Sequence, residues 1–193
     1  WGEYGMDRVG FLVSTNPGTP PGPLNRIASG GELSRFLLAL KVVLAGTGSV
    51  GTLVFDEVDS GVGGATAAAV GERLAKLAKD RQVLVVAGNH DHPRRLGALS
   101  PLLELTRVTL RPLVVPPAQG GTITLDVAGA VVRVAFLPWL SHRHAISADE
   151  LLNRDADQHN QSYLDRVRRI SGALTTGFDG GTVNLVVGHL TAV

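Results

Sequence analysis

Residues 82–91, which read QVLVVAGNHD, constrain the fold of this 193-residue chain more than any other stretch. The first five are an apolar run rich in valine, and such a run predicts a short buried β-strand. Asn89, His90 and Asp91 then place three polar side chains just beyond the strand. Open α/β sheets bind their ligands outside the carboxyl ends of the strands. The stretch therefore predicts an α/β fold with candidate chemistry at this strand end.

The same stretch divides the chain by composition. All three lysines precede it, and all six histidines lie within it or after it, which suggests two segments of separate origin. The net charge of +1 gives no overall field that would favour nucleic acid or a membrane. A DNA contact would need a local patch such as Arg166, Arg168 and Arg169. A solvated helix face is the favoured interpretation of that cluster.

Residue types that are absent limit the cell compartment and the class of protein. The chain has no cysteine, which excludes disulfides and thiolate metal sites and fits a reducing compartment. No apolar run approaches the ~20 residues that a bilayer requires, and no signal peptide is visible. We therefore expect a cytoplasmic protein without membrane contact. Because the chain begins at Trp1 and has Met6 as its single methionine, we expect a fragment.

A motif in the first part combines helix capping with glycines. Ser29 and Glu32 have the spacing of a capping box, so a well-capped helix running to about residue 45 is one interpretation. Gly30 and Gly31 would cost helix stability, yet they would let the backbone approach a bound group. A helix N-terminus favours an anion. The motif alone leaves phosphate binding and plain capping equally open.

A second motif places two carboxylates after a predicted strand at residues 52–55. Asp56 and Glu57 would be costly at the end of a buried strand unless they bind a metal or exchange protons. We expect Asp56 to hold Mg²⁺, and Glu57 to orient and deprotonate an attacking water. Asp59 would face a partner. The alternative is a solvated acidic loop in which Asp59 caps the next helix, residues 64–77.

These two motifs carry a family resemblance. ASGGELSR followed by TLVFDEVDSGVGG resembles the signature motif, Walker B strand and D-loop of SMC-like ABC ATPases. The similarity is to the C-terminal head lobe of the RecN family of DNA repair proteins, and it covers about residues 8–86. It predicts an ABC ATPase C-terminal lobe over residues 1–84.

The resemblance implies roles for particular residues. Ser29, Gly30 and Gly31 would bind the γ-phosphate of ATP held by a second subunit, and Asp56 and Glu57 would serve the Mg-ATP of their own head. A Walker A loop needs Gly-Lys-Ser/Thr, and no lysine here follows a glycine. We therefore expect the partner to be an SMC-like head lobe that carries Walker A, with a homo-oligomer left open. The half-site is not expected to hydrolyse ATP alone.

The family's switch histidine is also replaced. The Thr-His pair that follows this strand in the family corresponds here to Ala87 and Gly88. His90 comes two residues later instead. Because of that offset, His90 would need a rebuilt loop to act as the switch.

Beyond residue 86 the side chains suggest different chemistry. Asn89 offers an amide oxygen, a hard ligand suited to Mg²⁺ or Mn²⁺, and His90 could contact a phosphate or protonate a leaving group. The alternative is a helix cap with an exposed imidazole. His142 and His144 are expected in an irregular loop, where exposed histidines are favoured over a metal pair. The pattern predicts further elements: a helix 93–105, a short strand 108–110, a hairpin of residues 122–127 and 131–137, a charged helix 157–170 and a strand 182–187.

The second part carries its own resemblance. VVAGNHD, FLPWL and NLVVGHL are similar to segments of the SbcD family of nucleases, which are calcineurin-like metallophosphoesterases. The similarity covers about residues 83–193 and predicts a domain over residues 85–193. It implies that Asn89 and His189 are metal ligands for Mn²⁺ or Mg²⁺ and that His90 is the catalytic, phosphate-contacting residue. The family's Asp-x-His motif and second aspartate strand, expected before GNHD, are not found, and its last motif, Gly-His-x-His, which should follow His189, does not appear before the chain ends.

We therefore predict an α/β chain in which an ABC-ATPase C-terminal lobe is joined to a partial calcineurin-like metallophosphoesterase sandwich. The predicted function is that of a DNA double-strand-break repair and recombination fragment, with DNA as a partner. It would hold an ATP half-site and part of an exonuclease site. The alternative is a non-catalytic hybrid, because both sites lack motifs, and whether the chain is an enzyme is left open.

Overall fold

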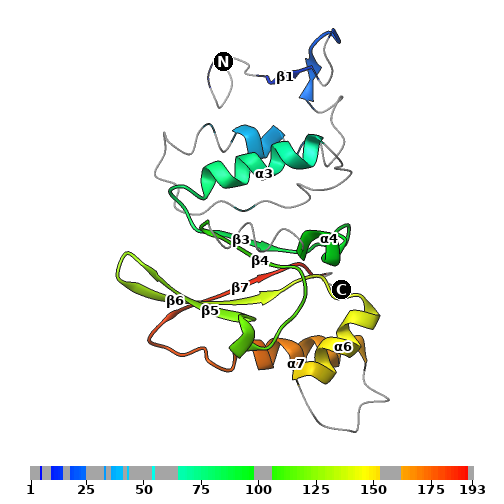
Figure 1. Cartoon of the computed structure of the whole chain (residues 1–193). Coiled ribbons are helices and arrows are strands. Elements are labelled where there is room, and N and C mark those ends of the chain that lie inside the picture. Colours follow the sequence, from blue (N-terminus) through cyan, green and yellow to red (C-terminus); the bar gives the residue numbers. More distant parts are fainter. Residues whose placement is uncertain are drawn as a thin grey trace. The chain divides into compact units, whose positions relative to one another are not determined.

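The structure of the chain, a computed structural model, describes residues 5, 10–14, 18–24, 33, 36–40, 43, 54, 65–97, 106–152 and 162–190 (Figure 1). It contains helices and sheets, so the prediction of an α/β chain is confirmed. The chain forms two compact units, Trp1–Lys76 and Leu77–Val193. This boundary precedes the predicted one at residues 84/85, and the predicted strand 82–86 lies in the second unit. The assignment of a separate origin to each part stays a prediction.

The first unit begins with a short antiparallel pair. Strand β1, Leu12–Val13, pairs with β2, Gly22–Pro23. The backbone N–H of Leu24 donates to the carbonyl of Phe11 over 3.2 Å and extends this pairing. Strand β2 lies at the end of a stretch rich in proline and glycine, of which residues 18–23 are described. Proline is tolerated there because, among the described residues, β1 and β2 form a sheet of two strands alone.

Two helical segments follow in this unit. Residues 33, 36–40 and 43 are helical, as predicted, and Leu38 is fully buried. The ring of Phe36 lies edge-on to that of Phe11, with centroids 6.2 Å apart. Helix α3, Ala65–Leu77, confirms the predicted alanine-rich helix.

The strand predicted at residues 52–55 is represented in the described residues by Val54 alone. Val54 lies outside any strand and its side chain is 76% exposed, so the prediction of a buried strand is wrong at this residue. An apolar run is buried only where a neighbouring element packs over it, and the run itself does not show whether one does.

The second unit is built on a three-stranded sheet in the order β5-β6-β7. Strand β5, Thr122–Val127, is antiparallel to β6, Ala130–Leu137, and β7, Val183–Gly188, is parallel to β6. These strands confirm the predicted hairpin and the predicted strand near residues 182–187. The hairpin turns through Ala128 and Gly129, whose φ angles are 54° and 83°. Positive φ at both central residues is typical of a two-residue turn that matches strand twist.

Strand β6 is the centre of this unit because both of its faces are covered. Successive side chains of a strand point to opposite faces. One face contributes to a core with residues of β3, Val83–Val86, and the opposite face to a core with α7. Strand β3 pairs in parallel with β4, Val108–Arg111. The first core contains Val132, Val134, Phe136, Leu84 and Val86, and the second contains Ala135, Leu137, Ile170 and Leu174.

The second unit thus has three layers, a two-stranded sheet, the three-stranded sheet and a helix pair (Figure 1). Helix α4, Pro93–Gly97, follows β3 and begins with the proline expected in its first turn. The short 3₁₀ helix η1, Pro117–Gln119, precedes β5.

The helix pair consists of α6, His142–Leu152, and α7, Tyr163–Thr175. The expectation that His142 and His144 lie in an irregular loop is wrong. Ser141 precedes α6, and its Oγ accepts from the backbone N–H of His144 over 3.2 Å, as an N-cap does. Residues two apart on a helix point about 200° away from each other, so this pair cannot share a metal ion.

Helix α7 differs in its limits from the helix predicted at residues 157–170. It begins after Ser162, whose Oγ accepts from the N–H of Asp165 over 3.2 Å, and it continues to Thr175. Residues 157–161, including His159, lie outside the described residues. In the part of the chain that the structure describes, no helix has the length and apolar character that a membrane span requires.

An ion-pair cluster joins the two helices. Asp149 of α6 is fully buried, with Oδ2 3.2 Å from Nη1 of Arg166 and Oδ1 3.2 Å from Nε of Arg169. Arg166 is itself only 8% exposed. The interpretation of Arg166, Arg168 and Arg169 as a solvated face is therefore wrong for Arg166, because a fully buried carboxylate needs a paired charge. Arg168 is exposed beside Asp165, at 3.7 Å.

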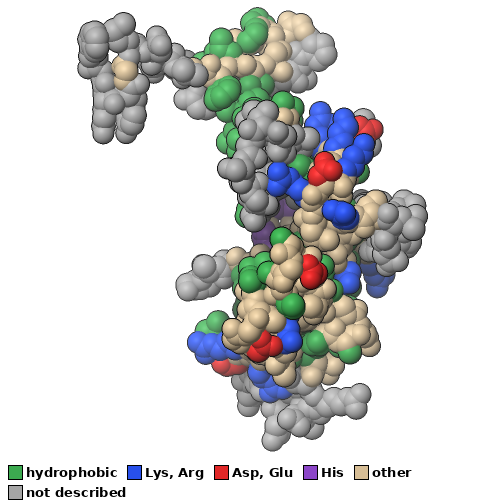
Figure 2. All heavy atoms as spheres, turned by 90° about the vertical axis from the view of Figure 1, so that its left-hand side faces the viewer, with side chains coloured by type: hydrophobic (Ala, Val, Ile, Leu, Met, Phe, Trp, Pro, Cys, Tyr) green, Lys and Arg blue, Asp and Glu red, His purple; other side chains and the backbone are tan. Residues whose placement is uncertain are grey.

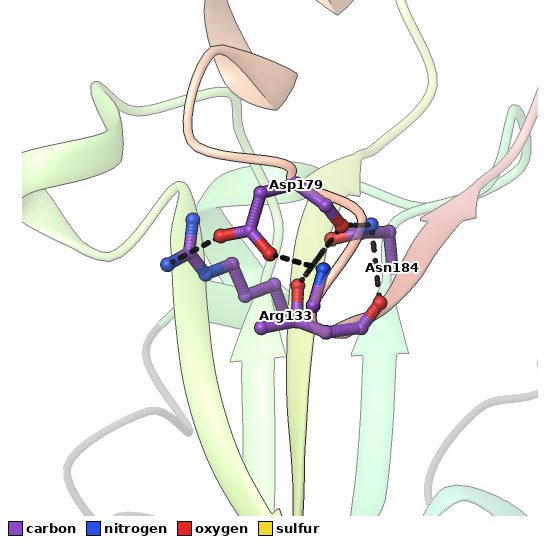
Figure 3. Close-up of polar contacts among 5 residues, drawn as sticks. Arg133, Asp179 and Asn184 are labelled. Atoms are coloured by element: carbon purple, nitrogen blue, oxygen red, sulfur yellow. Dashed lines mark hydrogen bonds and ion pairs between the residues drawn. The ribbon is translucent and has the colours of Figure 1, made fainter.

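The turn that leads into β7 is fixed to β6 (Figure 3). Nη2 of Arg133 lies 3.1 Å from Oδ2 of Asp179. The side-chain amide of Asn184 donates to the carbonyl of Asp179 over 2.6 Å, and the N–H of Gly181 donates to Oδ1 of Asp179 over 2.9 Å. These contacts lie at the beginning of β7 and set its start beside β6.

Candidate functional site

The carboxyl ends of β3 and β7 meet. Gly88 follows β3 directly after Ala87, and His189 is the first residue after β7. A Cβ atom placed on Gly88 would lie 3.3 Å from Nδ1 and 3.4 Å from Cε1 of His189. Residues a hundred positions apart are thus in contact because the two sheets pack against each other. This contact is tighter than usual for a Cβ atom, so a side chain at position 88 would require the imidazole to move by a few tenths of an ångström.

The end of β6 holds His189 from the other side. The backbone N–H of His189 donates to the carbonyl of Leu137 over 3.0 Å, and that of Trp139 donates to the carbonyl of Ala87 over 2.8 Å. The indole of Trp139 meets the imidazole edge-on, with centroids 5.7 Å apart at 82°. Aromatic pairs favour this arrangement. The imidazole therefore has a defined position among three strand ends.

A tight turn shapes the segment after β3. The N–H of Gly88 donates to Oδ2 of Asp91 over 2.7 Å, and the N–H of Asp91 donates to the carbonyl of Gly88 over 3.3 Å. A carboxylate that accepts from a nearby backbone N–H is a common way to fix a turn. Asn89 and His90 lie between these two residues with exposed side chains. We call Gly88, Asp91, Trp139 and His189, with Asn89 and His90, the strand-end cluster.

The predicted site residues fall into two groups. Asn89, His90 and His189 belong to the strand-end cluster, and their placement by β3 and β7 is as the strand pattern predicted. Ser29, Gly30, Gly31, Asp56 and Glu57 lie outside the described residues, so their assigned roles stay predictions.

Three members of the cluster, Gly88, Asp91 and Trp139, were not predicted as metal-ligating or catalytic residues. Asp91 was one of the three polar side chains expected just beyond the strand, but its role in closing the turn depends on a backbone contact that sequence does not show. Trp139 belongs to the FLPWL segment that carries the second resemblance, but it was given no role. The signal that could have found it is its position directly after β6, at the edge where the other strand ends were expected.

The donors of the strand-end cluster do not make up a metal site. They are one amide, two imidazoles and one carboxylate, and the carboxylate already accepts from Gly88. Within the described residues, no three His, Cys, Asp or Glu side chains are grouped so that they could hold an ion. A two-metal phosphoesterase centre needs several such ligands around each ion. The described residues therefore do not fit the implied Mn²⁺ centre.

Charged side chains are mixed on the surface that can be seen. On the face in Figure 2, Lys and Arg side chains lie among Asp and Glu side chains. The sequence suggested a patch of three arginines. Two of them, Arg166 and Arg169, form ion pairs with Asp149. They are therefore not available as a phosphate-binding pair.

Comparison with known proteins identifies part of the chain. It is 56% identical over 85 residues to the DNA repair protein RecN of Treponema pallidum, a match that covers 44% of this chain and 15% of that protein. For the RecN proteins of Deinococcus radiodurans and Streptomyces coelicolor the identities are 58% over 84 residues and 54% over 86 residues. These matches cover 43% and 45% of this chain, and 14% and 15% of those proteins.

No protein-family model matches the chain. The chain spans about 15% of the length of the relatives that it matches. Slightly less than half of the chain is therefore a RecN-like segment.

Proposed function

We propose that this chain is a fragment of a DNA double-strand-break repair protein whose first part supplies one half of an ATP site. The observation that carries the proposal is the identity of 56% over 85 residues with a DNA repair protein RecN. The matched length equals that of the predicted ATPase lobe to within a few residues. The signature and Walker B motifs in that lobe are the features that such a half-site requires.

The chemistry of each residue in the proposed half-site suggests its role. Ser29, Gly30 and Gly31 at a helix start would bind the γ-phosphate of ATP held by a partner lobe, since backbone N–H groups there favour anions. Asp56 would hold Mg²⁺ for the nucleotide of its own head. Glu57 would orient the attacking water and accept its proton. Because no lysine follows a glycine in this chain, the partner must supply Walker A.

The test is ATP-dependent association with a head lobe that carries Walker A. Sedimentation of the mixture should show a complex with ATP and none without nucleotide. Glu57→Gln should prolong that complex, because it keeps the shape of the side chain but removes the base. Glu72→Gln, at an exposed position of α3, is the matched control and should behave like the original chain. No effect of ATP on association would contradict the proposal.

A second candidate concerns the second unit. The contact between Gly88 and His189 joins the two strand ends that a phosphoesterase of the SbcD kind would use. On that hypothesis Asn89 and His189 are metal ligands and His90 contacts phosphate in a Mn²⁺-dependent DNA exonuclease. The described donors are too few for that centre, so we favour the non-catalytic alternative for this unit.

Calorimetry distinguishes these two candidates. We expect no Mn²⁺ binding beyond the weak heat of a surface carboxylate, and the same signal from the original chain, Asn89→Ala and His189→Ala. His142→Ala, which removes an exposed imidazole from α6, is the control for histidine content. Stoichiometric Mn²⁺ binding that both Asn89→Ala and His189→Ala abolish, but His142→Ala does not, would support the nuclease hypothesis instead.

A further inference from the structure

Asp179 differs from every other aspartate of the chain in the residue that follows it. It is the only aspartate that precedes a glycine, Gly180, and no asparagine precedes a glycine. Both residues are exposed, in the connection between α7 and β7. Glycine restricts the backbone least, and it has no side chain to shield its own amide nitrogen. In this setting the Asp179 carboxyl group can react with the next main-chain nitrogen.

The surroundings of Gly180 leave that nitrogen open. A Cβ atom placed on Gly180 would meet nothing within 4 Å. Among the described residues, none accepts a hydrogen bond from the N–H of Gly180. The N–H of Gly181, by contrast, donates to Oδ1 of Asp179 over 2.9 Å. The nitrogen that an attack on the carboxyl group requires is therefore not engaged elsewhere.

We propose that Asp179 and Gly180 form a site of spontaneous aspartate isomerisation whose rate is set by Arg133. The nitrogen of Gly180 loses its proton to solvent and attacks Cγ of Asp179, and one side-chain oxygen takes up protons and leaves as water. The five-membered imide that results is then hydrolysed. Opening at the main-chain carbonyl carbon leaves Gly180 linked through Cγ, as isoaspartate, and opening at Cγ restores aspartate. Water is lost and then regained, so the two forms have the same composition.

The contacts of the Asp179 carboxylate oppose this reaction. Oδ2 lies 3.1 Å from Nη2 of Arg133, and Oδ1 accepts from Gly181 (Figure 3). One of these oxygens must leave as water, so its contact has to break first. A guanidinium donates hydrogen bonds but does not give up its proton in proteins. Arg133 therefore slows formation of the imide in the folded chain.

Isomerisation would alter the turn that sets the start of β7. The main-chain carbonyl of Asp179 accepts from the side-chain amide of Asn184 over 2.6 Å and from Oγ1 of Thr182 over 3.4 Å. In isoaspartate this carbonyl carbon becomes a free carboxylate beside the main chain, and the main chain is one atom longer. The modified turn can no longer make the same contacts at the start of β7.

The test follows isoaspartate at residue 179 while the folded chain is incubated at neutral pH. Mass spectrometry with electron-transfer fragmentation distinguishes the two linkages at each aspartate. Isoaspartate should accumulate at this residue. Arg133→Gln should raise its rate of formation about two- to fivefold, the effect that a partly exposed ion pair supports. Arg133→Lys should restore most of the protection, and Arg168→Gln, which removes the exposed pair with Asp165, is the matched control and should change nothing.

Unfolding, salt and the glycine provide further controls. In denaturing urea the original chain and Arg133→Gln should isomerise at one common rate, because the ion pair is absent from both. Added salt screens the pair in the original chain and should raise the rate there, which tests the proposal even if circular dichroism shows that Arg133→Gln does not fold. Gly180→Ala, whose methyl group has open space, should lower the rate in the folded chain and in urea.

Three results would overturn the proposal. The first is the absence of isoaspartate at residue 179 from the folded Arg133→Gln chain or, if that variant does not fold, from the original chain in high salt. The second is an equal rate for the folded chain with and without the ion pair. The third is a difference between the original chain and Arg133→Gln that persists in urea.

Discussion

The second unit contains two groups of polar side chains that differ in burial and in what they do for the fold. The Asp149 cluster is enclosed between α6 and α7, and its carboxylate is fully buried between two guanidinium groups. The strand-end cluster lies where strands finish, and its Asn89 and His90 are exposed. The first arrangement stabilises packing of two helices, and the second leaves side chains available to solvent.

The comparison shows why residue type alone does not identify a site. Arginines and an aspartate are common in phosphate and metal sites, yet here they neutralise one another inside the helix pair. Histidine, asparagine and aspartate at strand ends are also common in metal sites, yet here the carboxylate closes a turn. The two clusters should therefore respond differently to substitution.

The largest effect is expected from Asp149→Ala. Removing this carboxylate breaks the ion pair with the buried Arg166, which should lower the free energy of unfolding by roughly 3–5 kcal/mol. Arg133→Gln removes the partly exposed ion pair with Asp179 but keeps the turn contact of Asp179 with Gly181, and it should cost about 0–1 kcal/mol. Urea unfolding of both variants measures the difference. Equal losses would mean that the Asp149 cluster contributes no more than a surface ion pair.

A smaller effect is expected from Gly88→Ala in the strand-end cluster. The added methyl would lie 3.3 Å from Nδ1 of His189, and such overpacking costs roughly 1–3 kcal/mol. The NMR signals of the His189 imidazole protons should shift in Gly88→Ala because the methyl group touches that ring. Gly71→Ala adds a methyl where nothing lies within 4 Å. It should stabilise α3 by up to about 1 kcal/mol. An unchanged His189 spectrum in Gly88→Ala would contradict the contact between the strand ends.

The hairpin turn between β5 and β6 lies outside both clusters and serves as a reference for the stability changes. Ala128 has a φ of 54°, a conformation that costs most L-residues roughly 1–2 kcal/mol. Ala128→Asn creates the Asn-Gly pair preferred in such turns, and it should raise the unfolding free energy by about 0.5–1 kcal/mol. Thermal unfolding shows directly whether Ala128→Asn raises or lowers the stability. A lower unfolding midpoint would show that the turn adopts another conformation.

The smallest effects are expected from Asn89→Ala and His90→Ala. Both side chains are exposed, and surface substitutions away from special features usually change stability by less than about 0.5 kcal/mol. Urea unfolding checks this. A loss of several kcal/mol in either variant would show that the turn residues are structural, like Asp149, and would remove the distinction between the clusters.

Much of the second unit's fold could be predicted from local pattern, whereas its polar contacts could not. The apolar run before Gly88, the residues around Gly129 and the run before His189 have patterns that determine strands by themselves. The α6 helix was not predicted because its first turn, with His142 and His144, has no apolar periodicity; the periodic residues are Ala145, Ala148 and Leu152. Those three have the spacing of a buried helix face, which was the available signal.

The burial of Asp149 had no local signal. Aspartate is rarely buried unless it is paired, and its partners come from another helix. The contact between Gly88 and His189 likewise depends on how two sheets pack, although the strand-end positions indicated the edge on which both would lie. Sequence therefore indicated where side chains lie along elements, but not which of them would neutralise each other.

The most direct test of the central claim, that the chain supplies only half of an ATP site, is a measurement of ATP hydrolysis. The chain alone should release no phosphate above the buffer rate. A mixture with a Walker A-containing head lobe should hydrolyse ATP, and Glu57→Gln in this chain should lower that rate by orders of magnitude while Glu72→Gln leaves it unchanged. Hydrolysis by the chain alone, or a mixed activity that Glu57→Gln does not affect, would contradict the claim.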